Sequence, residues 1–135
     1  MNSLDNVSWI DLPSVSDNRG TLTSIEENLD IPFCIKRIFY MHQILSDRGG
    51  HAHRYTDQVA IASSGAFLFN LYDGSSKQSF RLDNPLKGLY IPRMLFIEIF
   101  QEVPDSVCLV LANTHYDKNQ SIRTYQEFLD EKHVT

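Results

Sequence analysis

The chain has 135 residues, 42% hydrophobic and 21% charged, a composition that is ordinary for one globular domain. Its formal net charge of −5 argues against a nucleic-acid-binding protein, which usually carries a basic surface. No apolar run approaches the roughly 20 residues of a membrane span, and the start of the chain has no secretory signal pattern, so we expect no membrane contact and a cytoplasmic protein.

Short segments of alternating or continuous apolar residues predict about ten strands, separated by turn residues. The predicted strands include residues 7–12, 21–25, 34–42, 58–63, 66–72, 77–82, 89–91, 95–100 and 107–112. Residues 13–20 are expected to form a turn, and Asp73-Gly74 is a typical hairpin turn.

The spacing of apolar residues changes after residue 118. Ile122, Tyr125, Phe128 and Leu129 recur with helical spacing, which predicts one C-terminal helix of about three turns on the outside of the sheet. Many short strands without strand–helix alternation favour an all-β fold, a jelly-roll barrel or sandwich with this one helix. We expect residues 1–135 to form a single domain.

The strand predicted over residues 34–42 is mixed on both faces. Arg37 and Phe39 share one face, and Tyr40 lies on the other. In a barrel, one face would then hold the core while the other lines a cavity or contacts a partner. Cys34 and Cys108 lie far apart in apolar segments, which favours free thiols.

Two histidines stand out, because His51 and His53 follow two glycines and are two residues apart. In an extended segment their side chains point to the same side, so both imidazoles would enter one space. Such a pair is typical of a metal site or of an acid/base site, and the spacing alone leaves both open.

The segment from Gly49 through His51, His53 and Asp57 to Gly65 resembles the first cupin motif, and residues 88–93 lie at the place of the second. Further features resemble the WxcM-like 3,4-ketoisomerases that act on dTDP-4-keto-6-deoxyglucose. These features are Asp17-x-Arg19-Gly20, Ile35-Lys36-Arg37-x-x-Tyr40, Arg48-Gly-x-His51-Ala-His53, Tyr116-Asp117 and Ile122-Arg123-x-Tyr125.

This resemblance spans residues 17–125 and implies a cupin-fold isomerase without cofactor. It would interconvert the 4-keto and 3-keto forms of a dTDP-linked 6-deoxyhexose. The family's products lead to 3-amino-3,6-dideoxy sugars of surface glycans such as lipopolysaccharide O-antigen, or of antibiotics. The resemblance also implies a homodimer that exchanges strands.

One position departs from the cupin pattern. Metal cupins supply a third histidine from the second motif, whereas Ile97 stands at that position here. Two imidazoles without a further nitrogen ligand make a poor metal site, so we predict no metal. Ile97 is expected to affect which epimer is made, as is Asn18 in the Asp17–Gly20 turn, and Glu98 is a further candidate for contact with the sugar.

Moving a ketone from C4 to C3 requires removal of the C3 proton and delivery of a proton to C4, through an enediol. Histidine supplies a base with a pKa near 7, and we predict His51 in that role. Tyr40 is predicted to relay a proton, and His53 to hold His51 or a sugar hydroxyl. Asp57 is expected to fix an imidazole tautomer or to contact the substrate.

A diphosphate needs fixed cations, preferably arginines. The candidates are Arg19, Arg37, Arg48 and Arg93, with Arg37 foremost because it lies in the middle of a strand. Other functions remain open: a 3,5-epimerase, a non-catalytic sugar-binding cupin, and a metal-dependent cupin enzyme.

Overall fold

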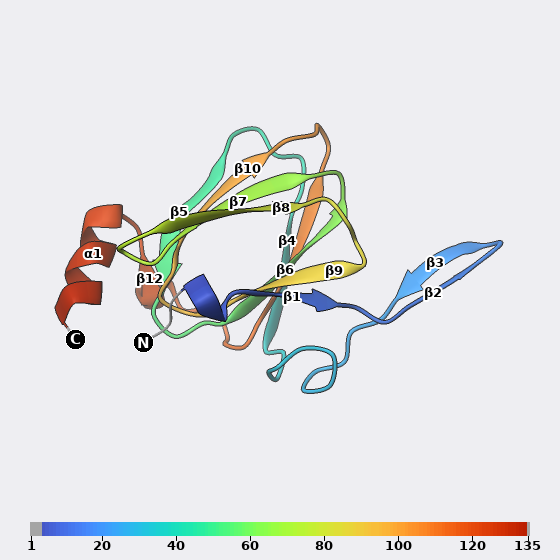
Figure 1. Ribbon diagram of the computed structural model, residues 1–135, viewed down its shortest axis with the longest axis horizontal. Helices are drawn as coiled ribbons and strands as arrows, with labels where there is room; N and C mark the ends of the chain where they lie inside the picture. Colours follow the sequence, from blue (N-terminus) through green and yellow to red (C-terminus); the bar gives the residue numbers. More distant parts are fainter. Residues whose placement is uncertain (1–3, 135) are drawn as a thin grey trace.

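A computed structural model describes residues 4–134, which form two facing antiparallel sheets (Figure 1). The first sheet has the order β1 (Ser8–Asp11), β9 (Lys87–Ile91), β6 (Gln58–Ser64), β11 (Val107–Ala112) and β4 (Arg37–Met41). The second has the order β12 (Ser121–Ile122), β5 (Arg48–His53), β10 (Phe96–Gln101), β7 (Phe67–Tyr72) and β8 (Lys77–Leu82). The predicted all-β jelly-roll class is confirmed.

Each of the nine predicted strands has a counterpart in the structure, but residues 13–20 do not form only a turn. They contain β2 (Ser14–Asp17), which pairs with β3 (Gly20–Thr23) in a separate hairpin. Hydroxyl pairs join the two strands, Ser14 to Thr23 at 2.7 Å and Ser16 to Thr21 at 2.8 Å. The hairpin escaped prediction because β2 is exposed along its whole length and therefore shows no burial period.

The C-terminal helix α1 spans Tyr125–Val134 and begins later than residue 118. Asp117 caps a short 3₁₀ helix η2 (Lys118–Gln120), and Ile122 then pairs with Ala52 as part of β12. Ile122 therefore belongs to the sheet and is not part of the helical stripe. A second short 3₁₀ helix, η1, covers Leu4–Asn6.

The main core lies between the two sheets, and smaller clusters cover their outer faces. Helix α1 covers the second sheet, as predicted: the Phe128 side chain is fully buried, with its ring centroid 5.8 Å from that of Phe96. Arg54, directly after β5, forms an ion pair with Glu131 of α1 at 2.7 Å. The helix thus braces the edge of the sheet that carries the two histidines.

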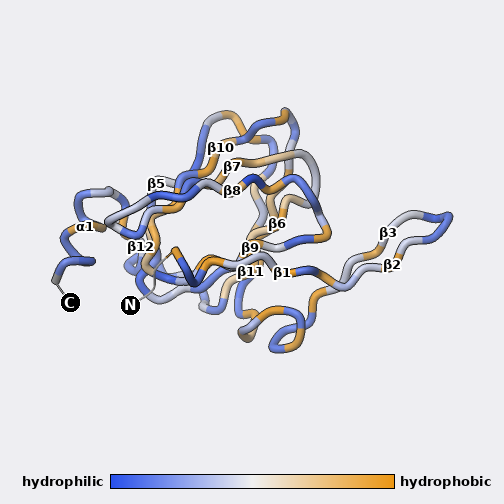
Figure 2. Tube along the Cα trace, viewed as in Figure 1, coloured by the Kyte–Doolittle hydropathy of each residue, from blue (hydrophilic) through white to orange (hydrophobic). Residues whose placement is uncertain are grey.

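The β2–β3 hairpin projects away from the barrel, and its tip is hydrophilic (Figures 1 and 2). Farther from the tip, Val15 and Leu22 lie opposite each other and are 67% and 66% exposed. Within residues 4–134, no helix is long and apolar enough to cross a membrane.

Candidate active site

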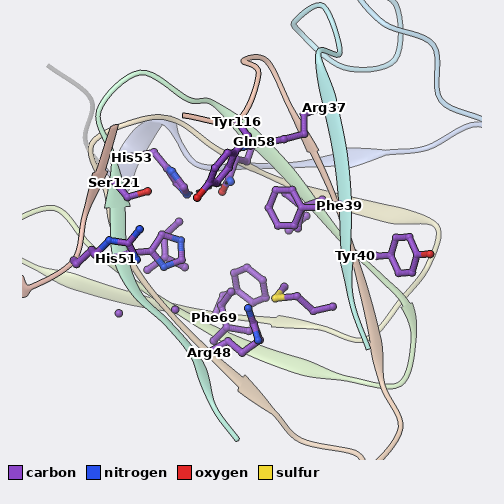
Figure 3. A pocket seen from close by; sticks show the side chains of 18 of the residues that line it. Arg37, Phe39, Tyr40, Arg48, His51, His53, Gln58, Phe69, Tyr116 and Ser121 are labelled. Atoms are coloured by element: carbon purple, nitrogen blue, oxygen red, sulfur yellow. Dashed lines mark hydrogen bonds between the residues drawn. The ribbon is translucent and has the colours of Figure 1, made fainter. Parts of the chain in front are cut away.

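A cavity of about 720 Å³ lies between the two sheets, within the size range of small-molecule sites. Its lining residues lie on β4, β5, β6, β7, β10 and β11, and further ones come from the loop before β5 and from residues 116–123. His51 and His53 point into this space from β5, while Phe39 lies across from them on β4 (Figure 3). Both imidazoles therefore share one interior, as their spacing predicts.

Gly49 sets the position of the histidine strand. Its φ of +97° is unfavourable for other residues, and a Cβ there would lie 2.7 Å from the Ile97 carbonyl oxygen. This close approach of β5 to β10 places His51 opposite Ile97 in the register. Ile97 is 3% exposed and lines the cavity. The position beside His51 at which we expect contact with the substrate therefore carries an aliphatic side chain.

The environment keeps both imidazoles in the neutral form at pH 7. Burial lowers the pKa of His51, and the positive charges of Arg123 and Arg48 add to that effect, while a hydrogen bond with the Gly49 backbone opposes it. Burial lowers the pKa of His53 to about 3, with further contributions from His51 and Arg37. A neutral imidazole is the form that can accept a proton.

The ring of His53 is held by its neighbours. Its centroid lies 4.8 Å from that of His51 with an interplanar angle of 81°, and its Nε2 lies 3.3 Å from Nε2 of Gln58. The Nδ1 atom of His53 is buried without a hydrogen-bond partner. Buried polar atoms are nearly always satisfied, so a ligand in the cavity would supply a partner that this atom lacks.

Arg37 also has a buried polar atom without a hydrogen-bond partner, its Nε. Its guanidinium carbon lies 5.4 Å from the ring centroid of Phe39 and 5.6 Å from that of Tyr116, and all three residues line the cavity. The two rings orient the guanidinium but leave its hydrogen-bonding capacity unused. Such a group suits an anionic ligand.

Asp57 lies outside the cavity lining, contrary to its predicted role at the imidazoles or the substrate. Its carboxylate accepts hydrogen bonds from the Arg93 backbone at 2.8 Å, the Arg93 guanidinium at 3.1 and 3.2 Å, and Asn113 Nδ2 at 3.1 Å. Arg93 is likewise absent from the cavity lining. These residues tie together the loops that follow β5, β9 and β11.

Glu98 also lies away from the cavity, because it follows the inward-facing Ile97 and successive residues of a strand point to opposite faces. Its carboxylate accepts a 2.5 Å hydrogen bond from Tyr72, and this raises the pKa of Tyr72 to about 12.

Tyr40 borders the cavity, but its ring points away from the interior (Figure 3) and is 61% exposed. It packs instead against His42, with ring centroids 5.2 Å apart. Arg37 and Phe39 occupy the inward positions of the same strand, so the alternation of β4 excludes Tyr40 from the interior. The predicted proton relay therefore has no support in the cavity of this chain.

Asn18 and Arg19 lie at the tip of the β2–β3 hairpin, where both are exposed and neither lines the cavity. Arg19 pairs with Asp17 at 2.6 Å. Arg48, in contrast, lines the cavity at an exposed position, and its contact with the diphosphate stays a prediction.

Several lining residues were not predicted as site residues, among them Gln58, Ser121 and Arg123. Gln58 is 5% exposed, and its position at the polar end of an apolar strand was the available signal. Ser121 pairs with His53 in the register of β12 and β5. Arg123 belongs to a stretch that contributed to the family resemblance, but its spacing gave no clue that it would approach His51.

Within residues 4–134, no group of three or more His, Cys, Asp or Glu side chains is arranged to hold a metal ion. The two cysteines in that range are free, with Cys108 buried and Cys34 half-buried.

Residues 5–133 match the family model FdtA, described as WxcM-like, C-terminal. The chain is 38% identical over 121 residues to the TDP-4-oxo-6-deoxy-alpha-D-glucose-3,4-oxoisomerase of Aneurinibacillus thermoaerophilus, covering 88% of this chain and 87% of that protein. It belongs to the FdtA family of sugar 3,4-ketoisomerases. The predictions of this family and of an isomerase are confirmed.

Solved structures of family members superpose closely on this fold. QdtA from Thermoanaerobacterium thermosaccharolyticum, a sugar 3,4-ketoisomerase in complex with TDP, has a TM-score of 0.92 at 36% identity, covering 96% of each chain. The TDP-quinovose 3,4-ketoisomerase WlaRB of Campylobacter jejuni has a TM-score of 0.89 at 36% identity, covering 94% of this chain and 99% of its own. WlaRA, the TDP-fucose-3,4-ketoisomerase of the same organism, has a TM-score of 0.88 at 33% identity, covering 96% and 97%.

Proposed function

We propose that this family member binds a dTDP-linked 4-keto-6-deoxyhexose in its barrel and converts it to the 3-keto isomer through an enediol, with His51 as the base. The observation that carries the proposal is the cavity itself. It combines two imidazoles held neutral by burial with an arginine whose Nε has no partner. Family relatives that act on the same class of sugar nucleotide support it.

His51 is suited to remove the C3 proton. A hydrogen bond to the backbone raises a histidine pKa when a ring N–H donates to a carbonyl, so one nitrogen of His51 is engaged with Gly49. The other nitrogen keeps its lone pair in the neutral ring. This lone pair takes the proton from C3, the C3–H electrons form the C3=C4 double bond, and the C4=O electrons move to O4. O4 carries the negative charge of the enediolate until it receives the proton that O3 loses.

The second half of the reaction reverses these roles. The protonated His51 delivers a proton to C4, O3 loses its proton, and the ketone forms at C3. No oxidant or reductant is consumed. The positive charge of Arg123, which influences His51, is also suited to stabilise negative charge on the enediol oxygens.

His53 is assigned to the sugar oxygens. Its low pKa keeps the imidazole neutral throughout the working pH range, so it does not compete with His51 as a base. Gln58 restrains its ring, and Ser121 lies opposite it on β12. A restrained neutral imidazole provides a hydrogen bond to a sugar oxygen without a net charge.

The diphosphate is assigned to the arginines of the cavity. Arg37 lies inside, whereas Arg48 and Arg123 are exposed at its border. Guanidinium groups form strong, charge-assisted hydrogen bonds with phosphate oxygens. A 3-ketone is the group that a transaminase converts to a 3-amine, which supports a place before amination in the synthesis of 3-amino-3,6-dideoxy sugars.

A second copy of the chain is proposed to cover the β2–β3 hairpin. A two-stranded hairpin alone is marginally stable in water, and this one exposes Val15 and Leu22. The outer face of β4 adds Ile38 and Tyr40, 57% and 61% exposed. A homodimer with exchanged hairpins would cover apolar surface and would carry Arg19 of each hairpin to the other copy.

Sedimentation velocity tests this assembly. The wild type is expected to sediment as a dimer, and Val15→Asp with Leu22→Asp is expected to shift it toward monomer. A wild type that sediments as a monomer at all concentrations would refute the exchange.

The reaction is tested by incubating the protein with dTDP-4-keto-6-deoxyglucose in deuterated water and recording NMR spectra. We expect deuterium at the ring carbons and a new ketone at C3. Unchanged substrate, with TDP still bound in a parallel titration, would contradict the isomerase and favour a non-catalytic sugar-nucleotide-binding protein.

A further inference from the structure

The two walls of the cavity differ in their capacity to move protons. The second sheet contributes His51 and His53, both on β5. On the first sheet, the described lining residues within the strands are a guanidinium, an amide and mainly apolar side chains: Arg37, Phe39, Met41, Gln58, Ala60 and Val110, with the Tyr40 ring turned outward. Guanidinium and amide groups do not exchange protons as general acids near neutral pH.

Proton-bearing groups at the mouth do not alter this asymmetry. Asp47, Tyr116 and Asp117 line the cavity from outside the strands and are exposed, and the Tyr116 ring packs against the guanidinium of Arg37, 5.6 Å from the ring centroid. Next to His51, the inward position on β10 is the aliphatic Ile97. Phe39 lies across from the histidines (Figure 3), and like the lining residues Ala60 and Val110 it carries no exchangeable proton. A hexose that offers its C3 hydrogen to His51 and packs its other face on these side chains meets no acid there.

The face from which C4 is protonated determines the product. In the chair of 4-keto-6-deoxy-D-glucose the C3 hydrogen is axial, and it leaves from one face of the ring. A proton returned to C4 on that same face leaves O4 axial, which is the 6-deoxygalactose configuration. Delivery from the opposite face leaves O4 equatorial, the 6-deoxyglucose configuration, and needs an acid across the ring.

We infer that this enzyme transfers the carbon proton on a single face of the sugar through His51 and makes the product with an axial O4, a dTDP-3-keto-6-deoxygalactose. The inference rests on the proposed ketoisomerase function and adds its stereochemistry. Relatives named for quinovose, which is 6-deoxyglucose, and for fucose, which is 6-deoxygalactose, match this chain about equally well, so the similarity does not choose between the two products.

The bonds balance within the substrate and His51. The C3–H bond breaks and a C4–H bond forms, and His51 carries the proton between the two carbons. The proton lost from O3 equals the one gained by O4. Part of the hydrogen that leaves C3 is expected to reappear at C4, because the buried imidazolium exchanges with water only partially during the short life of the enediol.

The test is NMR of the wild type acting in ordinary water on dTDP-4-keto-6-deoxyglucose, unlabelled or carrying deuterium at C3. We expect a 3-keto product with a small H4–H5 coupling, and retention of some C3 deuterium at C4 in the labelled substrate. A 3-keto product with a large, trans-diaxial H4–H5 coupling would overturn the inference while leaving the isomerase intact. Absence of any 3-keto product would overturn both.

Discussion

Two polar clusters of this protein differ in how completely their hydrogen bonds are satisfied. The cluster of Asp57, Arg93 and Asn113 joins three loops, and each oxygen of the Asp57 carboxylate accepts hydrogen bonds. In the cavity, Arg37 Nε and His53 Nδ1 are buried and have no partner. Because satisfied groups stabilise a fold and unsatisfied ones cost free energy, the first cluster is built for stability and the second for a ligand.

The largest expected effect is on kcat, and it distinguishes a histidine inside the cavity from one outside it. His51→Asn should lower kcat by about 10²- to 10⁴-fold, because it removes the general base. The matched control is His42→Asn, since His42 is exposed and packs against Tyr40. Steady-state kinetics on dTDP-4-keto-6-deoxyglucose measure both variants. Equal rates for His51→Asn and the wild type would remove the base assignment.

Asp57→Ala should affect folding more than catalysis. The substitution leaves Arg93 and Asn113 without their shared acceptor, and we expect the free energy of unfolding to fall by about 1–3 kcal/mol. Urea denaturation measures the loss, and the KM of the folded variant should stay near that of the wild type. A large increase in KM without loss of stability would place Asp57 in the substrate site instead.

His53 should make folding sensitive to acid. Its pKa is about 3 in the folded protein against an ordinary value of 6.5, so between these values the unfolded chain holds more protons. The stability it contributes is complete above pH 6.5 and is lost as the pH falls toward 3. Urea denaturation between pH 7 and 4 should show a slope of at most about 1.4 kcal/mol per pH unit from this group.

The variant His53→Gln isolates that contribution. Its unfolding free energy should decline less steeply with acid than that of the wild type. Parallel curves for the two proteins would show that His53 titrates normally and is not held neutral by burial.

Glu98→Gln should have the smallest effect. A glutamine oxygen can still accept the hydrogen bond from Tyr72, and the pair lies on the face of β10 opposite to Ile97. We expect kcat/KM within about twofold of the wild type and a stability change within about 0.5 kcal/mol. A loss of kcat/KM above tenfold would return Glu98 to the substrate site.

Period-two alternation predicted the strands and the shared orientation of His51 and His53, because burial on one face leaves a regular trace in the sequence. The same rule places Arg37 inside and Tyr40 outside. Because the two residues lie on opposite faces of β4, they cannot both point into one cavity. Strand β2 left no such trace because its residues are exposed along the whole strand.

The sequence does not show which side chains form hydrogen bonds with one another. Nothing in the chain order indicates that Asp57 pairs with Arg93 and Asn113, or that Glu98 pairs with Tyr72, since these contacts join loops and strands far apart in sequence. Arg123 reaches the neighbourhood of His51 because β12 adds to the edge of β5, and a two-residue strand has too little pattern to predict.

The most direct measurement of the difference between the two clusters is calorimetric titration of TDP into the wild type, Arg37→Met and Arg93→Met. The substitutions are matched, and each removes one guanidinium, from the cavity or from the paired cluster. We predict that Arg37→Met weakens TDP binding by about tenfold or more, whereas Arg93→Met leaves the Kd essentially unchanged. Wild-type affinity in Arg37→Met, or an equal loss in Arg93→Met, would contradict the account.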